Sequence, residues 1–170
     1  MTGKLLGAIL IITGCGVFGY AQSASYRKEE QLLRQFIAAL DYMQCELQYR
    51  MTPLPELCRQ TAAEGRGLIS RFLGSLAQEM EKQVQPCVAD CVTETISGIG
   101  PIPNRLLESF QHFGNSLGRF DVAGQIKELE FVRTYCRDEV TRMSENRDTR
   151  LRGYQTLGLC AGAALAIIFV

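Results

Sequence analysis

The stretch YRKEEQLLRQFIAALDYMQCELQYRM, from Tyr26 to Met51, decides the fold. Its apolar side chains recur every three or four residues, and charged or amide side chains lie between them. The apolar positions are Leu32, Leu33, Phe36, Ile37, Leu40, Met43 and Leu47. This spacing predicts an amphipathic helix of about seven turns, which buries one side against the rest of a helical domain.

The chain after Met51 repeats this pattern in shorter segments. Thr52 and Pro53 are typical of an N-cap and a first helical turn, so we predict a second helix from about Pro53 to Ala63. The later apolar stripes predict a third helix near 68–80, a fourth after Pro86 that ends in the loop 97–103, a fifth that ends near Gly118, and a last helix capped by Asp121. The predicted fold class is therefore all-α, with about six helices.

Both ends of the chain are apolar. Leu5 to Ala24 contains no charged residue over 20 positions, and Gly153 to Val170 is also uncharged. As helices these segments reach about 30 Å and 27 Å, which is enough to cross a bilayer. We predict a transmembrane helix in 1–24, a soluble helical-bundle domain in 25–152, and a transmembrane helix in 153–170.

The first and last helices of the bundle are predicted to continue into these two spans. Because both spans start from the same bilayer surface, these helices should run side by side and antiparallel as a stalk, with the four shorter helices on top. In the second span, Gly158, Gly162 and Ala166 form a stripe of small residues that allows close packing of another membrane helix.

Basic residues beside the two predicted spans indicate the orientation. They are Arg27, Lys28 and Arg34 after the first span and Arg137, Arg142, Arg147, Arg150 and Arg152 before the second, against Lys4 at the other side. By the positive-inside rule, the middle domain should face the cytoplasm.

A different interpretation of the first segment is a bacterial lipoprotein signal. Ile12 to Cys15 fits the lipobox at which such proteins are cleaved and acylated on cysteine. The apolar run continues past Cys15 to Tyr20, whereas a processed lipoprotein normally continues into a polar tether. An uncleaved anchor is favoured, and a surface lipoprotein acylated at Cys15 remains the alternative.

Composition and charge exclude several classes of function. Basic and acidic residues both number 18, so no overall field attracts nucleic acid. The seven cysteines are odd in number and are interpreted as reduced packing residues. Cys87, Cys91 and His112 form a possible metal or catalytic set, but no second cysteine pair accompanies them. We therefore predict no enzyme activity, metal or cofactor.

Three segments, in this order, resemble a known family. They are KLLGAILIITGCGVFGYAQSASY from Lys4, ELQYRMTPLPE from Glu46, and FGNSLG from Phe113, the last followed by Asp121 and Gln125. This order is similar to that of the stage III sporulation protein AB family of endospore-forming bacteria. The resemblance implies structural or partner-contact roles for Glu46, Tyr49, Thr52, Pro53, Leu54, Phe113, Gly114, Leu117, Gly118, Asp121 and Gln125.

The resemblance also implies a function. It suggests a non-catalytic platform or adaptor in a channel complex between mother cell and forespore, similar to the F-type inner-membrane platform proteins of type II secretion and type IV pilus machines. The implied partners are a cytosolic ATPase, like stage III sporulation protein AA, and other membrane components of the complex. The implied location is the mother-cell membrane around the forespore.

Overall fold

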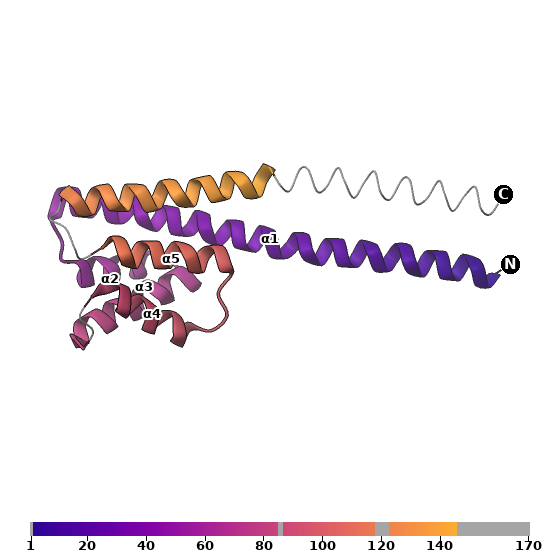
Figure 1. The fold of residues 1–170 in the computed structure, drawn as a ribbon, viewed down its shortest axis with the longest axis horizontal. Helices are drawn as coiled ribbons and strands as arrows, with labels where there is room; N and C mark the ends of the chain where they lie inside the picture. The colour runs from indigo at the N-terminus through magenta and orange to yellow at the C-terminus, as the bar shows by residue number, and fades with distance from the viewer. Residues whose placement is uncertain (1, 85–86, 118–122, 146–170) are drawn as a thin grey trace.

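The structure, a computed structural model, describes residues 2–84, 87–117 and 123–145, with side chains from Tyr26 onward. All regular elements in these ranges are helices (Figure 1). They are α1 (Thr2–Arg50), α2 (Leu54–Glu64), α3 (Leu68–Lys82), α4 (Val88–Ile99), α5 (Asn104–Ser116), and a helix over residues 123–145, called here the C-terminal helix. The predicted all-α class and the predicted helix number are confirmed for this part of the chain.

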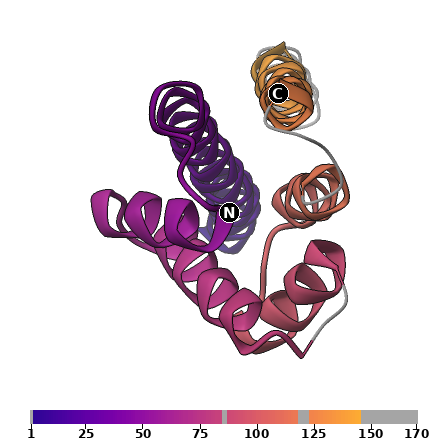
Figure 2. The same ribbon diagram turned by 90° about the vertical axis from the view of Figure 1, so that its left-hand side faces the viewer.

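The C-terminal helix lies beside the second half of α1 and runs in the opposite direction (Figure 1). Seen along the bundle, the helices follow one another around a common interior in chain order, so the last returns beside the first (Figure 2). The antiparallel pair was predicted correctly. The prediction that α2 to α5 lie on top of it was wrong, because the apolar stripe of α1 faces sideways and the short helices must pack along its flank.

The structure describes little of the two predicted membrane spans. Residues 2–25 are helical within α1, but their side chains, including that of Cys15, lie outside the description. The second span, 153–170, lies outside the described residues. Among the residues described, none of the helices combines the length and the apolar character needed to cross a bilayer.

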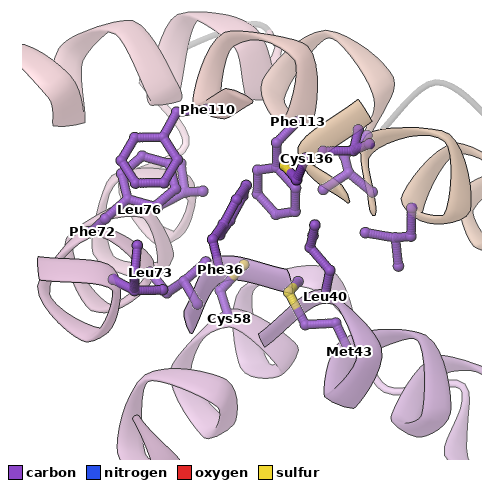
Figure 3. Close-up of a cluster of buried hydrophobic side chains, with 14 of the residues drawn as sticks. Phe36, Leu40, Met43, Cys58, Phe72, Leu73, Leu76, Phe110, Phe113 and Cys136 are labelled. Atoms are coloured by element: carbon purple, nitrogen blue, oxygen red, sulfur yellow. The ribbon is translucent and has the colours of Figure 1, made fainter. Parts of the chain in front are cut away.

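An aromatic cluster fills the centre of the bundle (Figure 3). Phe72 of α3 and Phe110 of α5 stack with ring centroids 3.6 Å apart and planes 4° from parallel. Phe36 of α1 meets Phe110 edge-on at 5.0 Å and Phe113 at 5.7 Å. All four side chains are fully buried, so α1, α3 and α5 are joined through one contact network.

Ion pairs at the edge of this core attach the C-terminal helix. Asp41 of α1 accepts a hydrogen bond from Arg133 at 2.8 Å and lies 3.8 Å from Arg137. On the other side, Arg105 of α5 donates to Glu139 at 2.9 Å. Between these two seams an apolar stripe is buried, consisting of Leu129, Val132, Cys136, Val140 and Met143.

Several sequence-based details need correction. Of the five described cysteines, Cys58, Cys91 and Cys136 are buried as predicted, whereas Cys45 is exposed and Cys87 is half-buried. The fourth helix continues through Ser97 to Ile99, and the Ser97 hydroxyl donates to the carbonyl of Thr93 within it. Serine tolerates a helix interior when its hydroxyl bonds back in this way.

We expect the seam formed by Asp41 with Arg133 and Arg137 to contribute measurably to the free energy of unfolding. Arg133 is only 22% exposed, so the substitution Asp41→Asn leaves its guanidinium with a weakened partner. The free energy of unfolding should fall by about 1–2 kcal/mol. Arg34→Gln, which breaks only an exposed pair with Glu30 within α1, should change it by less than about 0.5 kcal/mol. Urea unfolding of the full chain in detergent measures both, and equal effects would contradict a special role of the seam.

Candidate functional site

The two groups of motif residues meet at one end of the bundle. The first lies at the turn between α1 and α2, and the second at the end of α5 and the start of the C-terminal helix. Figure 1 shows both at the end of the bundle opposite the N-terminus. Because successive helices alternate in direction, segments about sixty residues apart in sequence come to the same end, which spacing alone did not indicate.

At the first turn, the chain leaves α1 through a left-handed residue. Met51 has φ 51°, and its side chain is 71% exposed. Tyr49, one of the motif positions, is 78% exposed. Two large side chains in water and a non-glycine residue in the left-handed region are features that functional surfaces often share.

Thr52, Pro53 and Leu54 begin the second helix differently from the prediction. Pro53 is the N-cap, and no side chain caps the helix, so the predicted Thr52 cap was wrong. Instead, the carbonyl of Pro53 accepts from the backbone N–H of Leu57 at 2.8 Å. The φ of Pro53, −57°, suits this position without help from a side chain.

Glu46 lies just inside this turn. Its side chain is 14% exposed and pairs with Arg50 at 3.5 Å. Its Oε2 is buried and accepts no hydrogen bond within the described structure. This oxygen is the one that faces Arg50, so the charge of Glu46 is compensated by an ion pair and not by a hydrogen bond.

At the second group, Gly114 permits close packing of α5 on α4. A Cβ added to it would lie 2.9 Å from Cγ2 of Val92 and 3.3 Å from Cα of Ala89. Phe113 and Leu117 beside it are buried in the core. Gly114 is therefore a point of close contact between α4 and α5, and α5 ends at Ser116 with Leu117 as its C-cap.

The remaining predicted positions are less informative. Gln125 is half-buried near the start of the C-terminal helix. Gly118 and Asp121 lie outside the described residues, and so do Gly158, Gly162 and Ala166.

The cysteine and histidine set does not converge. Cys87, the N-cap of α4, donates from its thiol to Asp90 at 2.9 Å, while Cys91 is buried. His112 is exposed on α5, where its ring packs against Tyr135 with centroids 4.6 Å apart. Among the described residues, no three His, Cys, Asp or Glu side chains are grouped as metal ligands would be.

A groove beside α1 was not predicted. It has a volume of about 320 Å³ and lies between α1 and the turn that joins α2 to α3. Its lining residues are Gln35, Ala38, Ala39, Tyr42, Thr61, Glu64, Gly65, Arg66, Ile69 and Ser70. The sequence held a signal for it, because Ala38 and Tyr42 stand four residues apart on the side of α1 that the main apolar stripe leaves open.

Comparison with known proteins gives the family. Residues 4–170 match the family model of stage III sporulation protein AB. The chain belongs to the stage III sporulation protein AB family. It is similar to stage III sporulation protein AB of Bacillus subtilis (strain 168), with 22% identity over 173 residues that cover 98% of this chain and 99% of that protein.

A solved structure of stage III sporulation protein AB has the same fold. The two superpose with a TM-score of 0.62 at 18% sequence identity, over 72% of this chain and 98% of that one. Membership of the stage III sporulation protein AB family gives this chain a role in sporulation, and the family is not a known enzyme family. The resemblance inferred from the three sequence segments is confirmed.

We expect Gly114→Ala to destabilise the protein. The added methyl group meets the backbone of α4 as well as Val92, so the helices must separate. Overpacking of this kind costs about 1–3 kcal/mol in the free energy of unfolding. Gly98→Ala is the matched control, because nothing lies within 4 Å of its added Cβ, and it should stabilise α4 by about 0.5–1 kcal/mol. A neutral Gly114→Ala in urea unfolding would contradict the close contact.

The described cysteines should differ strongly in reactivity. Burial raises the pKa of Cys58 to about 12 and also raises the pKa values of Cys91 and Cys136, so little thiolate forms at these sites. Iodoacetamide at pH 8 should alkylate exposed Cys45 first, as mass spectrometry of the peptides can show. The Cys58 thiol has its ordinary pKa of 9.0 in the unfolded chain and a pKa of about 12 in the folded chain. Between these two values the unfolded chain loses the thiol proton first. The free energy of unfolding should therefore decrease as the pH rises from 9 toward 12. Rapid alkylation of Cys58 in folded protein would contradict its burial.

Proposed function

We propose that this chain is a non-catalytic membrane platform of the sporulation channel complex between mother cell and forespore. In this proposal, residues 1–24 and 153–170 cross the mother-cell membrane around the forespore, and residues 25–152 face the cytoplasm. There the helical domain docks a cytosolic ATPase like stage III sporulation protein AA and connects it to the membrane components.

The observation on which the proposal rests is the continuity of α1. A single helix runs from Thr2 to Arg50, so the apolar first segment and the amphipathic bundle helix form one element. A helix that passes from an apolar segment directly into the core of a domain is suited to hold that domain at a fixed height above a bilayer.

The attachment of the C-terminal helix supports the same role. Its two ion-paired seams, to Asp41 on one side and to Arg105 on the other, flank a continuous apolar stripe. The C-terminal helix is therefore held to α1 through Asp41 and to α5 through Arg105, so the antiparallel pair of long helices also shares α5 as a support. Such a pair transmits displacement or torque better than a flexible linker does.

In this proposal the partner ATPase hydrolyses the nucleotide, and this chain supplies the binding surface. The described residues contribute exposed apolar side chains, a groove and paired charges, which are features of binding surfaces. The basic residues beside the segments 1–24 and 153–170 support the cytoplasmic orientation through the positive-inside rule.

A binding experiment tests this function. The full chain in detergent, immobilised through a tag, should retain the purified stage III sporulation protein AA-like ATPase of the same organism saturably, with and without nucleotide. An unrelated cytosolic ATPase is the control. Absence of binding by folded chain would contradict the docking role. Palmitate labelling that disappears on Cys15→Ala would instead favour the surface lipoprotein.

A further inference from the structure

The loop between α4 and α5 lies at the end of the bundle that faces the N-terminal half of α1 (Figure 1). The direction of α5 follows from its contacts with the C-terminal helix, which runs antiparallel to α1. Arg105 pairs with Glu139, and Glu108, one turn later on α5, accepts a hydrogen bond from the earlier residue Tyr135. Helix α5 is therefore antiparallel to the C-terminal helix and parallel to α1, so its first residue lies nearest the apolar segment 5–24.

The aromatic cluster gives the height of this loop, meaning its position along the axis of α1. Phe36 meets Phe110 with ring centroids 5.0 Å apart, so these two residues lie at about the same height. Asn104, where α5 begins, precedes Phe110 by about 9 Å of helix. Ala24, where the first predicted span ends, precedes Phe36 by about 18 Å. The start of α5 therefore lies about 9 Å from the end of that span.

This height corresponds to the polar surface of a bilayer. The hydrocarbon core is about 30 Å thick, and the whole bilayer with its headgroups is about 40–45 Å thick. Each headgroup layer is therefore about 5–7 Å deep. Because a side chain extends several ångström beyond its backbone, the loop that leads into Asn104 is within contact distance of lipid headgroups.

The loop has the composition expected at such a surface. From Thr95 to Asn104 the sequence TISGIGPIPN contains no charged residue. Ile99 and Ile102 are half-buried and pack against the core, and Pro101 between them is exposed. An uncharged turn with apolar and small polar groups loses little hydration when it enters the boundary between water and hydrocarbon.

The other turns within the described ranges contain or directly follow a charged residue. The turn between α2 and α3 carries Glu64 and Arg66, and it lies beside residues 35–42 of α1, farther from the predicted span. At the opposite end of the bundle, the chain turns after Arg50 and again after Lys82. The turn without charge is therefore the one that lies nearest the predicted bilayer.

We propose that the loop 97–103 lies in the headgroup layer of the bilayer and supports the helical domain there, at a third point besides the two predicted spans. The inference rests on the proposed function, because it requires residues 1–24 to cross the membrane. The occupant is lipid and not another protein, because α1 itself brings the loop to this height. The contact restricts tilting of the domain relative to the bilayer.

The chain contains no tryptophan, which makes a direct test possible. Three single-tryptophan variants of the full chain, Pro101→Trp, Phe18→Trp and Arg66→Trp, are reconstituted in vesicles of phosphatidylcholine and phosphatidylglycerol. Part of the phosphatidylcholine carries a nitroxide, which quenches tryptophan at close range, either on the headgroup or in the middle of an acyl chain. The measurement is the loss of emission relative to vesicles without nitroxide.

The three variants should differ in the quencher to which they respond. Pro101→Trp should lose more emission with the headgroup nitroxide than with the acyl-chain nitroxide. Phe18→Trp, about 9 Å inside the end of the predicted span, should show the reverse order. Arg66→Trp is the matched control, because Arg66 is exposed like Pro101 but lies on the charged turn, and it should keep its emission with both.

The outcomes separate this inference from the proposed function. If Phe18→Trp is not quenched by the acyl-chain nitroxide, the first span is wrong and the loop contact fails with it. If Phe18→Trp is quenched but Pro101→Trp keeps its emission with the headgroup nitroxide, only the loop contact is wrong. Equal quenching of Arg66→Trp and Pro101→Trp would contradict a specific role of the loop. A blue shift of Pro101→Trp that grows with the protein-to-lipid ratio, without quenching, would assign the loop to a second copy.

Discussion

Burial of one side of α1 is the interaction on which the rest of the structure depends. Phe36 contacts Phe110 and Phe113 of α5, and Phe110 in turn stacks on Phe72 of α3. Each buried aromatic side chain contributes about 1.5–3 kcal/mol from removal of apolar area from water. Without Phe36, α1 would lose its ring contacts with both phenylalanines of α5.

The sequence predicted those features that depend on local periodicity. The stripe through Leu33, Phe36 and Leu40 is buried as expected. Periodicity assigns a side chain to a face of its own helix, but it does not say which helix lies opposite. For that reason the flanking position of α2 to α5 was missed, although the stripe itself was found.

The candidate site could be predicted only in part, for a similar reason. Thr52 fits an N-cap by residue type, yet the backbone of Pro53 begins α2 and no side-chain hydrogen bond is needed. That Tyr49 and Leu117 come to the same end depends on the alternating directions of the helices, which is a property of the whole topology. The groove was missed because Arg66 and Ala38 are remote in sequence.

The ion pair between Asp41 and Arg133 joins residues that are 92 positions apart. At ordinary translation rates of about 5 to 20 residues per second, α1 leaves the ribosome about 5 to 20 seconds before its antiparallel neighbour is complete. During that interval the contacts of α1 with α2, α3 and α5 can already form, since these helices are synthesised first. The C-terminal helix then closes an otherwise assembled domain, so a nascent chain exposes its future contact surface for several seconds and a chaperone has time to bind there.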